Sequence, residues 1–198
     1  MTVTISMTRR SNRLPWVSSL MLALTIGFGI PAHAALDIGQ AAPNFSAPAA
    51  LAGKPFVFSL AAALAKGPVV LYFFPTAFSQ GCSIEAHEFA EATGKFQALG
   101  ASVVGVSTDD IDTLSKFSSQ VCQGKFPVAS DESRVITQSF DAVMQTRPDF
   151  ANRISYVIAQ DGSVAFYYLN LNPTRHVEKT LDALRALQRT KPAKPGLN

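Results

Sequence analysis

The sequence predicts a mixed α/β fold in which helices cover a central sheet. Two short apolar runs, Val69–Pro75 and Ser102–Ser107, have the β-branched and aromatic content of buried strands. An amphipathic segment follows each run, and a helix that connects two strands of one sheet makes those strands parallel. Two later apolar runs flank Gln160–Ser163, whose Asp-Gly pair indicates a hairpin and therefore an antiparallel strand pair.

The segments before the first buried strand have a weaker pattern. Ala35–Ser46 is small, polar and proline-bearing, and predicts an extended lead-in with Phe45 as an apolar anchor. Lys54–Phe58 predicts a short strand. Ser59–Lys66 predicts one or two helical turns.

The strand Val69–Pro75 leads into a loop that ends at Cys82. After the loop, Phe89, Phe96 and Leu99 recur near helical spacing and predict an amphipathic helix. Cys82 would then lie in the first turn of that helix, where unpaired backbone N–H groups and the helix dipole favour negative charge. Since the thiolate is the reactive form of cysteine, this placement indicates a reactive thiol.

The rest of the chain continues the alternation of strands and helices, and it contains no internal repeat. The further predicted elements are a helix over Ile111–Gln120 capped by Asp109 or Asp110, a short strand Phe126–Val128, a helix capped by Asp131 and running through Phe140, the strands Arg153–Ile158 and Val164–Tyr168, and a last helix from Pro173-Thr174.

The first 34 residues predict an export signal, and residues 35–198 then form one domain. A basic region, Arg9–Arg13, precedes a mostly apolar run of 14 residues, Val17–Ile30. An A-x-A cleavage site, Ala32–Ala34, follows. The run is short for a membrane span, so we expect cleavage, with an uncleaved anchor as the alternative. The signal is bacterial in style and indicates a periplasmic protein that does not contact the membrane after cleavage.

Composition and charge exclude several classes of protein. The chain is 47% hydrophobic and 16% charged, which is typical of a globular domain rather than a disordered one. The net charge of +3 comes from three arginines within the export signal, and the remaining residues are formally neutral. The sequence therefore predicts no nucleic-acid partner.

The two cysteines, Cys82 and Cys122, both follow the cleavage site. Two cysteines in an oxidising compartment are typical of a structural disulfide. The position of Cys82 at a helix start instead favours a reactive thiol. Both interpretations remain open at this point.

The segment Pro75–Cys82 matches the pattern P-x-x-x-T/S-x-x-C and resembles the peroxiredoxin family. Its surroundings are similar to the bacterioferritin-comigratory, or Q-type, branch. Gly39–Phe45 is similar to the N-terminal G-x-x-A-P-x-F segment of that branch, and Glu85 and Arg153 stand where its motifs place them. The resemblance extends over roughly residues 37–188. It implies a thioredoxin-like fold with an N-terminal extension, and a thiol peroxidase.

The resemblance also implies roles for individual residues. Cys82 would attack the peroxide, and Ser79 and Arg153 would donate hydrogen bonds to the reacting oxygens, together with the Cys82 backbone N–H. Pro75 would shape the loop and shield the site from water. Glu85 would orient Arg153, although it could also be a solvated acid that only complements the helix dipole.

The chemistry itself requires a cation beside the sulfur. An unperturbed cysteine with a pKa of about 8.5 is about 3% thiolate at pH 7. Lowering such a pKa to about 6 takes about 3.4 kcal/mol. A helix N-terminus supplies only about 0.3–1 kcal/mol. Arg153 is the cation that the resemblance implies.

A resolving cysteine often follows the reactive cysteine by five residues in the Q-type branch, but here His87 occupies that position. Cys122 is the candidate that remains, and a bystander thiol is the alternative. An intramolecular disulfide between Cys82 and Cys122 would require backbone movement if their Cα atoms lie farther apart than about 7 Å. We interpret His87 as an exposed or packed residue, and His176 as solvated near the start of the last helix.

The resemblance implies a peroxide substrate and a thioredoxin-like or glutathione-linked reductant. The sequence indicates no cofactor and no metal, and we expect a monomer. Three other functions remain open: a thioredoxin-like thiol-disulfide protein, a copper-delivery module, and a binding domain with a structural disulfide. The first would need a second cysteine in Cys82–Glu85, and the second a C-x-x-x-C pair, and both are absent.

Overall fold

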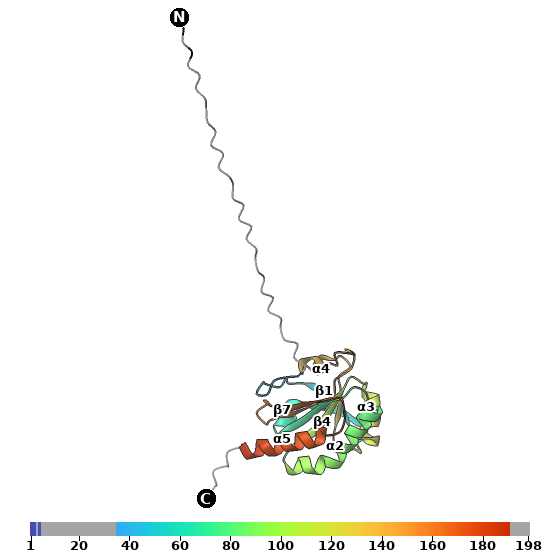
Figure 1. Cartoon of the computed structure of the whole chain (residues 1–198). Helices are drawn as coiled ribbons and strands as arrows, with labels where there is room; N and C mark the ends of the chain where they lie inside the picture. The colour runs from blue at the N-terminus through green and yellow to red at the C-terminus, as the bar shows by residue number, and fades with distance from the viewer. Residues whose placement is uncertain (3, 5–34, 191–198) are drawn as a thin grey trace. The chain divides into compact units, whose positions relative to one another are not determined.

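A computed structural model describes Met1, Thr2, Thr4 and residues 35–190. The predicted export signal lies outside the described residues apart from those first three, and so does the tail 191–198. Within the described part, seven strands form one mixed sheet with helices on both faces (Figure 1). The strands are β1 (Ser46–Leu51), β2 (Lys54–Ser59), β3 (Val69–Phe73), β4 (Ser102–Ser107), β5 (Val128–Ser130), β6 (Ile154–Ile158) and β7 (Val164–Leu169). The helices are α1 (Leu60–Leu64), α2 (Gln80–Ala98), α3 (Ile111–Gln120), α4 (Val135–Ser139) and α5 (His176–Thr190).

The sheet confirms the predicted mixture of parallel and antiparallel pairs. Its strand order is β2-β1-β5-β4-β3-β6-β7. The helical crossovers make β3, β4 and β5 parallel neighbours. β6 runs antiparallel to β3 and forms the predicted hairpin with β7. The end of β3 therefore lies between the end of β4 and the start of β6, which brings Arg153, immediately before β6, close to the loop that follows β3.

Side chains of β3 alternate between two apolar cores. Val69, Leu71 and Phe73 join the core beneath α1 and α4. Val70 and Tyr72, together with Phe74 directly after the strand, join the core beneath α2, α3 and α5, and both cysteines belong to this second core. The two cysteines thus lie on the same face of the sheet, the one that α2 and α5 cover in Figure 1.

The sequence did not predict β1. Its residues are mostly small, Pro48 interrupts it, and neither property is typical of an inner strand. In the structure β1 pairs with β2 on one side and β5 on the other, and Ala49 and Ala50 are fully buried. Small residues allow close packing here, and Phe45 anchors the segment against Phe58 and Phe140 as predicted.

Three predicted elements begin later than expected, for local reasons. α4 starts at Val135 rather than directly after Asp131, because the Asp131 carboxylate accepts bonds from N–H groups within the helix. α5 begins at His176, after Arg175 adopts a left-handed φ of 78°. β5 begins after Pro127, which has no N–H to donate to a neighbouring strand.

No helix in the described residues is both long and apolar enough to cross a membrane.

Candidate active site

Cys82 occupies the third position of α2 and is almost completely buried. Ser79 precedes the helix with extended backbone, and the first bond of the helical series joins the Ser83 N–H to the Ser79 carbonyl at 2.9 Å. The N–H of Cys82 comes before that series begins. The sulfur therefore lies at the positive end of the helix, as the sequence predicted.

The loop between β3 and α2 is fixed from the neighbouring strand. The Asp109 carboxylate accepts bonds from the Ala77 N–H at 2.7 Å and from the Ser107 hydroxyl at 2.6 Å. Phe78 adopts a left-handed φ of 62°, which is uncommon for a bulky residue. Asp110, rather than Asp109, caps α3. Asp109 and Asp110, which were expected as alternative caps, thus have different roles: Asp110 caps α3, and Asp109 holds the active-site loop.

Arg153 is buried and reaches three partners in three directions. Its Nη2 donates to the Cys82 sulfur at 3.3 Å, and its Nε donates to the Leu171 carbonyl at 2.9 Å. Its Nη1 donates to Oε2 of the Glu85 carboxyl group in a close contact. Burial opposes the charge of Arg153, but Glu85 and Cys82 more than offset that effect and raise its pKa. A fixed cation therefore faces the sulfur.

Gly81 provides the space for this contact. A Cβ at this position would stand 3.1 Å from Arg153 Nη2 and 3.8 Å from its Cζ. The separation of 3.1 Å from Nη2 is tighter than ordinary van der Waals contact. The glycine before the cysteine thus lets the guanidinium approach the sulfur across the first turn of α2.

Glu85 lies one turn after Cys82 on the same helix and is fully buried. The alternative interpretation, a solvated acid in the first turn, is therefore wrong. Burial raises the pKa of Glu85 from its usual 4.5 to about 8, even though Arg153 acts in the opposite direction. The carboxyl orients the guanidinium and itself takes up a proton readily.

His176 was interpreted as a solvated residue, and this interpretation is wrong. The ring is fully buried at the start of α5, 2.8 Å from the Ser155 hydroxyl and 2.9 Å from the Asn170 carbonyl. Its Nδ1 lies 3.4 Å from the second oxygen of Glu85. The side chain belongs to the same buried polar group as Glu85 and Arg153, and no local pattern in the sequence indicates this.

Ser79 and Pro75 occupy the loop as predicted, but the Ser79 hydroxyl is already engaged. It donates to the Thr76 carbonyl at 2.9 Å, and it makes no capping bond to α2. A hydroxyl has one proton, so in this conformation Ser79 accepts hydrogen bonds from a ligand and does not donate them. Pro75 is buried at the end of the strand segment.

Cys122 lies in the turn after α3, fully buried, and both cysteines are free thiols. Burial raises the pKa of the Cys122 thiol, so it is protonated in this packing. Tyr72 is close enough to both sulfurs to interact with them: burial raises its pKa well above the usual value, and both sulfurs add to the shift. The Tyr72 hydroxyl is buried and makes no hydrogen bond to the described residues.

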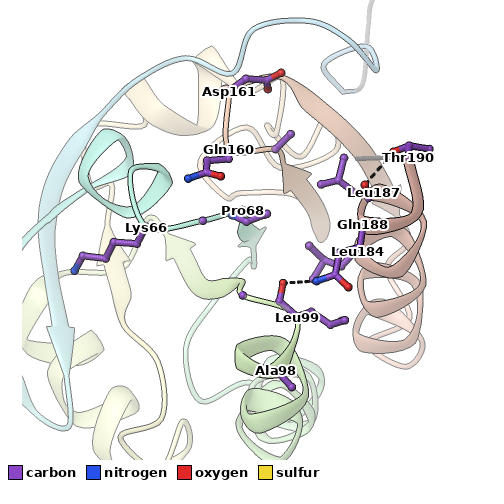
Figure 2. A pocket seen from close by; sticks show the side chains of 13 residues that line it. Lys66, Pro68, Ala98, Leu99, Gln160, Asp161, Leu184, Leu187, Gln188 and Thr190 are labelled. Carbon is purple, nitrogen blue, oxygen red and sulfur yellow. Dashed lines mark hydrogen bonds between the residues drawn. The ribbon is translucent and has the colours of Figure 1, made fainter. Parts of the chain in front are cut away.

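A separate cavity of about 790 Å³ lies at the other end of β3 (Figure 2). It is lined by the segment before β3, the ends of α2 and α5, and the turn after β6. Gln188 reaches across it and donates to the Leu99 carbonyl at 2.9 Å. None of the predicted site residues lines this cavity.

The fold, together with a Cys82 sulfur that contacts Arg153, defines a thiol protein with a thioredoxin fold. Residues 38–167 match the model of the AhpC/TSA family. The chloroplastic peroxiredoxin Q of Arabidopsis thaliana is 33% identical over 154 residues, which are 77% of this chain and 69% of the relative. The chain belongs to the AhpC/TSA family, in the peroxiredoxin Q branch that the motif around Cys82 indicated.

Two further comparisons agree with this assignment. The chloroplastic peroxiredoxin Q of Populus jackii is 32% identical over 121 residues, which are 61% of this chain. The chain spans 56% of the length of that relative. Among solved structures, the crystal structure of peroxidoxin BcpB from Mycobacterium tuberculosis superposes with a TM-score of 0.69 at 28% identity, covering 77% of this chain and 98% of that one.

Proposed function

We propose that this protein is a thiol-dependent peroxidase that reduces hydrogen peroxide or organic hydroperoxides through Cys82. The single observation that carries the proposal is the contact of 3.3 Å between Arg153 Nη2 and the Cys82 sulfur. A buried guanidinium beside a buried sulfur, at the positive end of a helix, favours the thiolate.

In the proposed reaction the Cys82 thiolate attacks one peroxide oxygen and the O–O bond breaks. The sulfur becomes a sulfenic acid, and the other oxygen leaves as hydroxide or alkoxide, which then takes a proton. Arg153 and the Cys82 N–H are the donors that stabilise the departing oxygen. Ser79, whose proton points to Thr76, accepts a hydrogen bond from the incoming hydroperoxide.

We further propose that Cys122 resolves the sulfenic acid. Its thiol attacks the oxidised Cys82 sulfur, water leaves, and an intramolecular disulfide forms. Because Cys122 is buried and protonated in this packing, the turn that carries it must open before it can attack. A thioredoxin-like or glutathione-linked reductant then restores both thiols. We also propose export to the periplasm and a monomer as the working form.

The experiment is stopped-flow oxidation of the reduced protein by hydrogen peroxide and by an organic hydroperoxide. The parent protein should react with second-order kinetics, and the Cys82→Ser variant should lose the reaction. A variant that consumes peroxide at the parent rate would refute the proposal. Mass spectrometry after about one equivalent of peroxide should find a bond between Cys82 and Cys122. A persistent sulfenic acid or a disulfide between two chains would exclude the resolving role of Cys122.

A further inference from the structure

One oxygen of the buried Glu85 carboxyl makes no hydrogen bond within the described residues. Oε2 accepts from Arg153, but Oε1 has no such partner, and the side chain is fully buried. The polar atom that faces it is His176 Nδ1, 3.4 Å away. A buried carboxylate oxygen without a donor is costly, so this gap indicates a position where a proton belongs.

The partners of His176 fix which ring nitrogen carries hydrogen. Nε2 lies 2.9 Å from the Asn170 carbonyl, which can only accept, so Nε2 is an N–H donor. In a neutral ring Nδ1 is then an acceptor with one lone pair, and it lies 2.8 Å from the Ser155 hydroxyl and 3.4 Å from Glu85 Oε1. An ionised Oε1 has no proton to offer Nδ1, so two electron-rich atoms face each other. A proton on Oε1 removes this repulsion and gives Nδ1 a second donor, which shares the lone pair with Ser155.

The surroundings favour that proton on the carboxyl rather than on the ring. Burial raises the pKa of Glu85 to about 8 and lowers that of His176 to about 4. The charge of Arg153 also disfavours a second cation beside it. A neutral acid and a neutral imidazole therefore replace the ion pair that the distance of 3.4 Å alone would suggest.

We propose that Glu85 and His176 form a proton-holding pair that leaves the positive charge of Arg153 to Cys82. With Oε1 protonated, the thiolate is the one anion that Arg153 faces among the described residues. When the pair loses its proton, Arg153 must divide its charge between the thiolate and a carboxylate. His176 is a positioning residue, because it acts on the sulfur only through Glu85 and Arg153. The kinetic consequence rests on the proposed peroxidase function, whereas the location of the proton does not.

Other titratable groups face the pair from each neighbouring element. Cys82 and Glu88 share α2 with Glu85, and Tyr72 faces it from β3. The Tyr168 ring of β7 lies 4.8 Å from the His176 ring. Tyr72 stays neutral, since burial raises its pKa well above the usual value. Glu88 is partly exposed, and burial raises its pKa too, so it requires its own control.

The first measurement locates the proton without using activity. Nuclear magnetic resonance of the reduced parent protein follows the Glu85 carboxyl carbon and the two ring nitrogens of His176 from about pH 5 to about pH 9. Glu85 should titrate near pH 8 and His176 should remain the neutral Nε2–H form. A carboxyl that is ionised throughout, or a charged imidazole at neutral pH, would overturn the proposal.

The second measurement is the rate of peroxide oxidation across the same pH range. The rate should decline as the pair loses its proton near pH 8. The amide in His176→Asn accepts a hydrogen bond from protonated Glu85 more weakly than the imidazole does, and it can also donate to the ionised carboxylate. The midpoint of the decline should therefore move down by about one pH unit, and the rate near pH 7.5 should fall about threefold. Glu85→Gln, which imitates the protonated acid, should abolish the decline.

Two matched variants separate this effect from other titrations. Glu88→Gln removes an acid one turn away on α2, and His87→Ala removes an exposed imidazole from the same helix. Both should keep the alkaline decline where the parent has it. A His176→Asn profile that superimposes on the parent profile would overturn the proposal. If instead the parent does not react with peroxide while Glu85 titrates near pH 8, the proposed function fails and the pair stands.

Circular dichroism checks that His176→Asn folds. If it does not, the titration of the parent protein and the Glu85→Gln profile still decide the question.

Discussion

Replacing Gly81 by alanine tests whether the approach of Arg153 to the sulfur matters. The new Cβ would stand 3.1 Å from Arg153 Nη2, so the guanidinium or the helix start must move by a few tenths of an ångström. The guanidinium is held by three polar contacts and has little freedom to adapt. The contact that lengthens is the donor bond to Cys82, now 3.3 Å.

The size of the effect follows from the bond that is weakened. A hydrogen bond to a charged group contributes about 1.5–3 kcal/mol. Losing about half of it, or roughly 0.75–1.5 kcal/mol, would slow oxidation of Cys82 about 4- to 13-fold. Alanine is also a better helix former than glycine by up to about 1 kcal/mol, so the Gly81→Ala helix itself should not be weakened.

Gly94 offers the matched control. It lies on the same helix, and a Cβ there would meet nothing within 4 Å. Gly94→Ala should therefore gain the higher helix propensity of alanine without changing the active site, and it should retain the parent rate. Stopped-flow peroxide oxidation measures both variants, and urea denaturation measures their stability. If Gly81→Ala reacts as fast as Gly94→Ala, the reasoning from the Arg153 contact is refuted.

Three further predictions follow from the buried polar groups. Arg153→Lys keeps the charge but carries its donors on a single nitrogen, which cannot replace the contacts of Nε, Nη1 and Nη2 together, so peroxide oxidation should slow at least tenfold, about 1.4 kcal/mol; an unchanged stopped-flow rate would contradict this. Tyr72→Phe removes a buried hydroxyl that makes no hydrogen bond to the described residues, and it should raise the free energy of unfolding by about 1 kcal/mol in urea denaturation; a loss of stability would indicate that the hydroxyl has a partner. Between pH 4.5 and about pH 8 the folded state holds a proton on Glu85 that the unfolded state has lost, so this group lowers stability as pH rises. The pKa of His176 moves from 6.5 down to about 4, so between these values this group raises stability as pH rises. The two effects oppose each other up to pH 6.5, so the free energy of unfolding should fall by about 2 kcal/mol between about pH 6.5 and pH 8, and a flat denaturation series would be inconsistent with a raised Glu85 pKa.

Local patterns were sufficient where large apolar residues or a specific turn mark the element. The strand β3 was predicted from its continuous run of β-branched and aromatic residues, and the β6–β7 hairpin from its Asp-Gly turn, because both signals are local. β1 was missed because its buried face consists of alanines, which do not distinguish a buried strand from a loop. The start of α5 was misplaced because Arg175 takes a left-handed backbone conformation that its residue type does not indicate.

By itself the sequence determined the strand, the loop and the helix start that carry Cys82, since each depends on neighbouring residues. It also named Arg153, through the resemblance to the peroxiredoxin family. Only the tertiary structure decided that this guanidinium, 71 residues from the sulfur, touches it, and that His176 lies buried against Glu85 rather than in solvent. The physical reason is that desolvation and charge pairing depend on which elements meet in space, and a linear pattern of residues does not contain that information.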